Sequence, residues 1–367
     1  MNSSPGNFRH LHRLTDDTGI AEHALGLIPR RKEGYSTDDQ ARALWACMEW
    51  MAFAPDSEKD GLYKLIDTYM AFLVWAQNDD GHFHNNFTYD RTREAESPSD
   101  DCLGRCLWAA ALAYTGLNGH HRSLAALELL NRAILRVRDL RHPRGWAYAL
   151  AAVSLLMRHS FPARLDSLRD MLTNRLLHGF RTHAAPEWVW FEPALTYGNG
   201  LLPWGLFCAY EVKRDGEILG AATQSLDFLI RHSMNGRGQI RPVGNKGWCT
   251  PGVRALWDQQ PIDVMKLALA SLKAYEMTGA SRYADIVERC RGWFYGENDA
   301  GVPMCDPKEG SAFDGLEKDG ANLNQGAEST ISYLLTEVIW LKLDKMKRGA
   351  ANATDRYEAR PVAEASV

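Results

Sequence analysis

The stretch YSTDDQARALW, residues 35–45, has the composition of a helix start followed by a closely packed helix. Ser36 or Thr37 can accept a hydrogen bond from a free backbone N–H of the next turn. Asp38 and Asp39 place negative charge where the helix dipole favours it. The alanines that follow allow other helices to approach closely. We therefore expect a tightly packed helix with two carboxylates at its N-terminus.

The same design returns in SPSDDCLGRCLW, residues 97–108, where Asp100 and Asp101 precede another helix of small residues. Apolar residues at helical spacing continue along the chain between turn signals rich in Gly and Pro. They predict eleven long helices, at residues 37–53, 58–77, 100–115, 123–138, 144–157, 165–180, 201–212, 217–231, 261–277, 281–295 and 324–341.

Two kinds of helix alternate in this series: one with small or apolar residues on most sides, the other amphipathic. Six helices of the first kind can be marked at Asp39, Asp101, Trp146, Tyr197, Asp263 and Glu328. Such a repeat is typical of stacked helical hairpins, because one hairpin cannot bury its own apolar face. We expect an all-α toroid of six inner and six outer helices, with the twelfth helix supplied by the N-terminal segment or missing.

The expected toroid spans residues 35–346, after an N-terminal segment at 1–34 and before a disordered, apolar-poor tail at 347–367. Short links follow the inner helices and long loops precede them. All long loops should therefore gather at one end of the toroid, with the N-termini of the inner helices. That end is the expected site.

The composition argues against several classes of partner. With a net charge of -4 and mixed charges along the chain, no basic face favours nucleic acid or anionic lipid. No run of about 20 apolar residues spans a bilayer, and the N-terminus lacks the apolar core of a secretory signal, so a cytoplasmic location is expected. The seven cysteines lack metal-site spacing and are expected to be reduced core thiols. No motif implies a cofactor or a metal.

Carboxylates at the expected mouth suit acid/base catalysis, although an acid in a first helical turn also stabilises any helix by about 0.3–1 kcal/mol. Two adjacent acids repel each other, so the second member of each pair needs another purpose or a cation such as Arg42 or Arg105. If Asp38 and Asp100 cap their helices, Asp39 and Asp101 point into the toroid. The expected catalytic residues are Asp39, Asp101, Glu328 and Glu192.

Polar and aromatic side chains near the inner-helix starts are the expected substrate contacts. Aromatic faces can stack on sugar rings, although each ring is as well suited to loop packing. Trp190, Trp204 and Trp248 are expected to border one cleft with Asp39 and Asp101. The full expected set is Asp38, Asp100, Tyr35, His82, His84, Trp190, Tyr197, Trp204, Arg241, Asn245, Trp248, Gln260, Asp263 and Gln325.

A ring of helices with acids and aromatics at one mouth resembles the six-hairpin, or (α/α)6-toroid, glycosidase superfamily. YSTDDQARALW is similar to the acid-pair helix start of bacterial α-mannanases of this architecture. Two Asp on successive inner helices resemble the unsaturated glucuronyl hydrolases. The resemblance implies this fold and a glycoside hydrolase that acts on a short oligosaccharide.

Two other functions stay open. One is a sugar epimerase or isomerase of the same architecture, which would use histidine pairs at inner-helix starts. It ranks lower because His82, His84 and His183, the histidines expected near the mouth, do not begin inner helices. The other is a non-catalytic carbohydrate-binding partner of a glycosyltransferase, in which the acid pairs would be scaffold.

Overall fold

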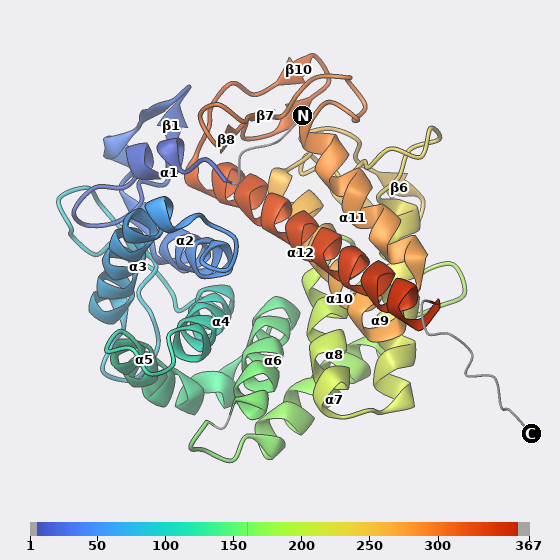
Figure 1. The fold of residues 1–367 in the computed structure, drawn as a ribbon, viewed down its shortest axis with the longest axis horizontal. Coiled ribbons are helices and arrows are strands. Elements are labelled where there is room, and N and C mark those ends of the chain that lie inside the picture. The colour runs from blue at the N-terminus through green and yellow to red at the C-terminus, as the bar shows by residue number, and fades with distance from the viewer. Residues whose placement is uncertain (1–5, 160, 359–367) are drawn as a thin grey trace, which may run out of the picture.

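The computed structural model describes residues 6–159 and 161–358, and six of its helices form a closed inner ring (Figure 1). Each inner helix contacts the next, and the last contacts the first. The inner helices are α2 (Thr37–Trp50), α4 (Asp100–Gly116), α6 (Pro143–Arg158), α8 (Leu201–Val212), α10 (Pro261–Thr278) and α12 (Ala327–Glu358).

Amphipathic helices pack outside the ring, each against the inner helix that precedes it. They are α3 (Asp56–Ala76), α5 (Ser123–Arg136), α7 (Asp166–His183), α9 (Gly216–His232) and α11 (Ser281–Phe294). All eleven expected helices are present, and the expected (α/α)6 toroid is confirmed. Two short 3-10 turns, Arg31–Glu33 and Val137–Asp139, interrupt the connections.

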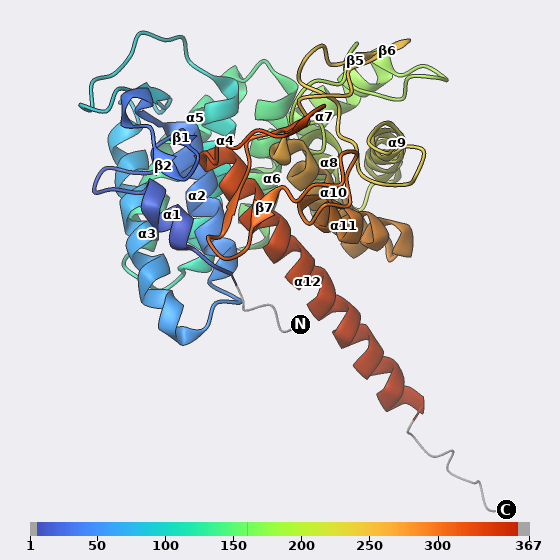
Figure 2. The same ribbon diagram turned by 90° about the horizontal axis from the view of Figure 1, so that it is seen from above.

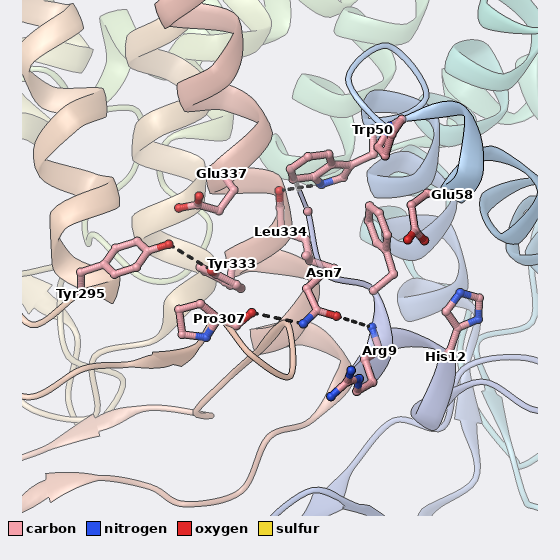
Figure 3. A pocket seen from close by; sticks show the side chains of 13 residues that line it. Asn7, Arg9, His12, Trp50, Glu58, Tyr295, Pro307, Tyr333, Leu334 and Glu337 are labelled. Atoms are coloured by element: carbon pink, nitrogen blue, oxygen red, sulfur yellow. Dashed lines mark hydrogen bonds between the residues drawn. The ribbon is translucent and has the colours of Figure 1, made fainter. Parts of the chain in front are cut away.

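The sixth outer position is filled by a single short helix, α1 (Arg9–Leu14), which packs on α12. The N-terminal segment therefore supplies the twelfth helix and closes the toroid, which was one of the two expected outcomes. Beside α1, the outer wall leaves a cavity of about 490 Å³ between residues 6–12 and α12. Figure 3 shows this cavity, in which Trp50 donates a hydrogen bond to the carbonyl of Leu334 at 3.0 Å.

Short antiparallel ladders fasten the long loops, and no sheet among the described residues has more than two strands. The pairs are β1 (Ala24–Leu25) with β2 (Ile28–Pro29), β3 (Tyr35–Ser36) with β4 (Asn86–Phe87), β5 (Cys249–Thr250) with β6 (Val253–Arg254), β7 (Cys305–Asp306) with β8 (Ser311–Ala312), and β9 (Leu316–Glu317) with β10 (Gly320–Ala321). Figure 2 shows β5, β6 and long loops on one side, whereas α12 projects from the other.

Serines, rather than the acids, cap the two acid-headed helices. The Ser36 side chain accepts from the backbone N–H of Asp39, and the Ser99 side chain accepts from that of Cys102. Ser36 was one of the two caps expected for the first of these helices, whereas the alternative in which Asp38 and Asp100 cap their helices does not hold. The Asp100 carboxylate instead accepts from the backbone N–H groups of Arg141 and His142, just before α6, so it ties two inner helices together.

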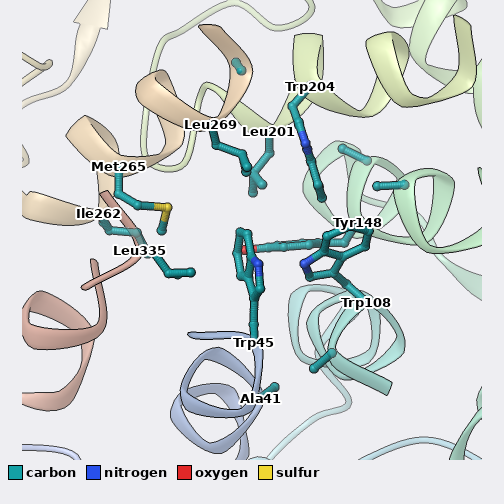
Figure 4. Packing of buried hydrophobic residues seen from close by; sticks show 14 of the residues in the cluster. Ala41, Trp45, Trp108, Tyr148, Leu201, Trp204, Ile262, Met265, Leu269 and Leu335 are labelled. Carbon is teal, nitrogen blue, oxygen red and sulfur yellow. The ribbon is translucent and has the colours of Figure 1, made fainter. Parts of the chain in front are cut away.

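Aromatic side chains from four inner helices fill the axis of the ring. Trp45, Trp108, Tyr148 and Trp204 point toward one another in Figure 4. The rings of Trp108 and Trp204 meet edge to face with centroids 4.8 Å apart. The centre of the toroid is therefore packed with side chains, and these side chains close the inner end of the mouth.

The end of the chain is helical for longer than the sequence predicts. The helix α12 continues to Glu358, past the expected tail boundary at residue 347, because residues 347–358 contain several strong helix formers such as alanine. Residues 359–367 of that tail lie outside the described residues. All seven cysteines are buried and unpaired, as expected. Among the described residues, no helix has both the length and the apolarity that crossing a bilayer requires.

Glycines allow the inner helices to touch at the backbone. A Cβ added at Gly104 of α4 would lie 3.0 Å from the carbonyl oxygen of Gly145 in α6. By contrast, a Cβ at Gly220 of the outer helix α9 would meet no heavy atom closer than 3.8 Å. The spacing of the inner ring thus depends on glycine at residue 104.

Gly104→Ala is expected to lower the free energy of unfolding by roughly 1–3 kcal/mol, because the new methyl overpacks the contact between α4 and α6. The control Gly220→Ala should raise it by up to about 1 kcal/mol, because alanine is the better helix former. Urea unfolding followed by circular dichroism measures both. Equal stability of the two variants would contradict the close packing.

Candidate active site

The loop end of the toroid holds two adjoining cavities, of about 320 Å³ and about 580 Å³. The first, here the Glu22 cavity, is lined by Glu22, His23, Ser36, Asp38, Asp39, Arg42, Asn85, Gln260, Pro261, Asp314, Gly326, Glu328 and Ser329. The second, the Glu192 cavity, is lined by Asp38, Arg42, Pro98, Ser99, Asp100, Asp101, Arg105, His142, Pro143, Arg144, Glu192, Tyr197 and Glu328. Asp38, Arg42 and Glu328 line both and form the wall between them.

Arg105 organises the acids of α2 and α4. Its guanidinium forms an ion pair with Asp38 and lies 3.8 Å from a carboxylate oxygen of Asp101. Burial acts to raise the pKa of Asp38, but the charges of Arg105 and Arg42 outweigh it and hold that pKa below its usual range. Asp38 is therefore an ionised carboxylate at neutral pH.

Arg42 holds a second pair of acids. It donates to Asp39 at 2.6 Å and lies 2.8 Å from Glu328, which projects from the first turn of α12. The Asp39 carboxyl also accepts from the Ser36 hydroxyl at 2.8 Å. Burial and the nearby carboxylates of Glu328 and Asp38 raise the pKa of Asp39. Asp39 is only 3% exposed, so it faces its own protein partners more than the cavity.

Glu22 comes from the N-terminal segment and lies across the start of α12, where its backbone carbonyl accepts from Ala327. Its side chain lines the same cavity as Asp38 and Asp39. Burial, followed by the charge of Asp39, raises the pKa of Glu22 to about 7. The Glu22 cavity thus combines an ionised carboxylate with a carboxyl that is half protonated near neutral pH.

The Glu192 cavity has its own ion pair. Arg144 of α6 donates to both carboxylate oxygens of Glu192, at 3.2 and 3.0 Å, and to the backbone carbonyl of Tyr197 at 2.6 Å. Tyr197 in turn donates to Asp101 at 2.8 Å. With 43% of its surface exposed, Tyr197 is the aromatic residue that offers a face to this cavity.

Asp263 lies near this site without lining either cavity. It is 7% exposed and accepts from the backbone N–H of Gly198 at 2.7 Å. Burial raises its pKa to about 7. Its contact with Gly198 places it between the start of α10 and the loop before α8, where it fixes the turn that carries Tyr197.

Most of the expected aromatic contacts lie elsewhere. Trp190 and Trp204 are buried, at 0% and 2% exposure, in the core between helices, because large rings near helix starts fill the packing there. Trp248 is partly buried behind Tyr197, with ring centroids 6.4 Å apart. Tyr35 is buried and donates to Asp16 at 2.7 Å. The expectation of one cleft bordered by Trp190, Trp204 and Trp248 is wrong.

Several expected polar contacts also serve the loops. His84 bonds the backbone of Asn86, and neither it nor His82 lines a mouth cavity. Arg241 pairs with Asp299 through two contacts, at 2.5 and 2.6 Å. The side-chain amide of Asn245 donates to the Asp258 carboxylate at 3.3 Å.

Of the two glutamines expected at the site, one lines a mouth cavity and the other does not. Gln325 is buried, where it accepts from Ser311 and does not line either mouth cavity. Gln260 does line the Glu22 cavity, with its amide donating to Asp258 at 2.6 Å. The structure thus brings Asp38, Asp39, Asp100, Asp101, Glu192, Tyr197, Gln260 and Glu328 to the mouth.

The mouth also contains polar residues that were not expected there, among them Glu22, His23, Asn85, His142, Arg144, Asp314 and Ser329. His142 is the N-cap of α6, so the expectation that no histidine near the mouth begins an inner helix is wrong. His183, by contrast, ends α7 and bonds the carbonyl of Gly179. The signal was present for His142, whose HPRG context marks a helix start, whereas Glu22 has no local signal. In the described part of the chain, no three His, Cys, Asp or Glu side chains are grouped to hold a metal ion.

Arg105→Met is expected to lower the free energy of unfolding by about 3–5 kcal/mol at pH 7, because it leaves Asp38 buried without its cation. In this variant Arg42 is the cation left near Asp38, and burial, the largest influence on this carboxyl, is expected to raise its pKa above the unfolded value. The deficit should therefore shrink as the pH falls toward 4 and the carboxylate is protonated. Asp38→Asn combined with Arg105→Met should recover much of the loss. A pH-independent deficit without recovery in chemical denaturation would contradict the pairing.

No family model and no curated protein sequence matches the chain. Solved structures do match its fold. Cellobiose 2-epimerase from Bacillus thermoamylovorans superposes with a TM-score of 0.71 at 11% identity, over 91% of this chain and 96% of that one. A D-mannose isomerase gives 0.67 at 10% identity, over 92% and 95%. A GH76 α-mannanase from Bacteroides thetaiotaomicron gives 0.67 at 9% identity, over 92% and 95%. At these identities the likeness shows the shared fold alone, the (α/α)6 toroid.

Proposed function

We propose that the protein is a glycosidase that hydrolyses a short oligosaccharide at the mouth of the toroid. The observation that carries the proposal is the pair of carboxyl groups in the Glu22 cavity. Hydrolysis of a glycosidic bond needs one protonated carboxyl and one ionised carboxylate around the same bond. Glu22, with its pKa near 7, supplies the first, and Asp38, held ionised by Arg105, supplies the second.

In this proposal Glu22 protonates the glycosidic oxygen as the leaving group departs. Asp38 either activates a water molecule or attacks the anomeric carbon. Asp39, which the sequence favoured as a catalytic residue, keeps Arg42 in place and adds the negative charge that raises the pKa of Glu22. Glu328, on the wall shared by both cavities, is the third acid within reach of a bound sugar.

The Glu192 cavity is proposed to bind the next sugar unit. Asp101, Glu192 and Arg144 offer donors and acceptors for hydroxyl groups, and Tyr197 offers an exposed ring face for the apolar side of a pyranose. The combined size of the two cavities is suited to a few sugar units. This supports an oligosaccharide rather than a long polymer as the substrate.

A sugar epimerase or isomerase is the second candidate, and two histidines favour it. His23 lines the Glu22 cavity at 3.6 Å from Glu22, and His142 lines the neighbouring cavity at the start of α6. A histidine can remove and return a proton near neutral pH. Among the structures that share the fold, one is a cellobiose 2-epimerase and another a D-mannose isomerase.

One experiment separates the two reactions. The protein is incubated in D2O with a panel of disaccharides and reducing monosaccharides, and the products are followed by NMR and mass spectrometry. Hydrolysis releases new reducing ends without deuterium on carbon. Epimerisation or isomerisation keeps the glycosidic bond and places deuterium on a sugar carbon. Saturable sugar binding without either product would favour the non-catalytic binding partner instead.

Glu22→Gln and Asp38→Asn should each lower kcat/KM for hydrolysis by roughly 10²–10⁴, the usual worth of positioned acid or base catalysis. The control Glu33→Gln removes an acid of the same N-terminal segment that does not line the cavities, and should keep full activity. If Asp39→Asn or Asp101→Asn abolishes turnover while Glu22→Gln does not, the roles belong to the acids that the sequence favoured.

The pH dependence gives a further check on Glu22. A general acid works in its protonated form, so kcat/KM should fall as the pH rises through about 7, the pKa of Glu22. Glu22→Gln should lose this alkaline limb in its residual activity. An unchanged limb in that variant would assign the titration to another group, such as Asp263.

A further inference from the structure

Lys266 lies on α10 at the axis of the ring and is fully buried. Its amine donates a hydrogen bond to the hydroxyl of Tyr148 at 2.5 Å. The same nitrogen lies 4.4 Å from the ring centroid of Trp45 and 4.8 Å from that of Tyr148. The amine therefore lies against two of the aromatic rings that fill the axis, close enough to Arg105 and Arg42 for their charges to act on it.

The groups around Lys266 disfavour a positive charge on it. Burial acts first, and the cations of Arg105 on α4 and Arg42 on α2 add repulsion. Glu328 on α12 and Asp263 on α10 act in the opposite direction but are outweighed, so the pKa of Lys266 lies well below its ordinary value. Trp45 on α2 and Tyr148 on α6 contribute rings without a charge.

An uncharged buried lysine makes the fold less stable at neutral pH. The unfolded chain binds a proton on this amine up to its ordinary pKa near 10.4, whereas the folded chain does not. Folding must therefore release that proton. Between the folded and unfolded pKa values, stability rises with pH. A methionine would fill the same space without this loss, so packing alone does not account for the lysine.

The contacts of Tyr148 connect Lys266 to the mouth. The guanidinium of Arg105 lies over the Tyr148 ring, 5.5 Å from its centroid. Arg105 then reaches Asp38 and Asp101, the acids of the first two inner helices. A continuous series of contacts thus runs from the axis of the ring to the carboxylates.

We propose that Lys266 is a positioning residue of the active site: by fixing Tyr148 it fixes Arg105, and Arg105 holds the carboxylates of Asp38 and Asp101 in their working geometry. The proposal rests on the catalytic function proposed above for this mouth. It predicts that the lysine is kept for activity at the expense of stability, a combination that functional residues often show.

The test compares Lys266→Met with Lys273→Met, a change seven residues further along the same helix. Lys273 is ion-paired with Glu211 and Glu276, each at 2.8 Å, at the opposite end of the toroid. At pH 7, Lys266→Met should melt at a higher temperature than the wild type, by a margin that shrinks toward pH 10. Lys273→Met should gain no stability and keep full activity.

Turnover and structure complete the test. Lys266→Met should lose at least tenfold in kcat with little change in KM, Tyr148→Phe should show the same loss, and the double variant should lose no more than either. A crystal structure of Lys266→Met should show the Arg105 guanidinium displaced from Asp38. If Lys266→Met melts at a lower temperature than the wild type, the Lys266 amine is not uncharged in the folded protein, and the proposal is overturned. Full kcat with Arg105 in place would overturn the positioning role.

The two proposals can fail separately. If the wild type turns over no sugar, the proposed catalytic function fails, and the crystal structure of Lys266→Met alone decides whether the lysine fixes Arg105. If the wild type is active and Lys266→Met is equally active with the same pH profile, the catalytic function stands and the positioning role is overturned.

Discussion

The ion pair between Arg105 and Asp38 is the interaction on which the mouth of this toroid depends. Asp38 lies in the first turn of α2 and Arg105 in the second turn of α4, where it is almost fully buried. An ion pair between a buried cation and a largely buried carboxylate offsets the cost of desolvation only when its geometry is held fixed. Asp101, Asp39 and Glu328 arrange themselves around this pair and around Arg42. Ion pairs therefore hold together the wall between the two cavities.

The ring supplies the rigidity that this arrangement requires. Glycine contacts such as Gly104 with Gly145 let α4 and α6 approach at the backbone, and the rings of Trp45, Trp108 and Trp204 fill the centre. Because the helices start at one end, their N-terminal dipoles all face the same group of carboxylates. The acids that the helices carry are thus placed by backbone packing rather than by flexible loops.

The sequence could predict the ring because its signals are local. Helical periodicity, small residues and acid pairs at Asp38 and Asp100 are each read within one turn or two. The sequence could also suggest Arg42 and Arg105 as partners of the acids, since they lie one turn beyond them in the same helices. The Ser36 cap of α2 was one of two local candidates, whereas the Ser99 cap of α4 was not named although its signal is equally local.

The rest of the site depends on contacts that are distant in sequence. Glu22 reaches the mouth only because its backbone carbonyl pairs with Ala327, some three hundred residues later. Trp190 and Trp204 illustrate the opposite error, since a large ring beside a helix start can face a ligand or the core with the same local sequence. Lys266 looked like an ordinary helical lysine, and only the closed ring places it at the axis.

A crystal structure with an oligosaccharide bound at the mouth is the most direct test of the proposed site. We expect the anomeric carbon of one sugar between the carboxyl groups of Glu22 and Asp38, with the next ring beside Tyr197. Carboxyl oxygens about 5–5.5 Å apart would indicate a retaining reaction, and about 6.5–9.5 Å an inverting one. A sugar bound with its anomeric carbon away from both groups, or at the opposite end of the toroid, would contradict the account.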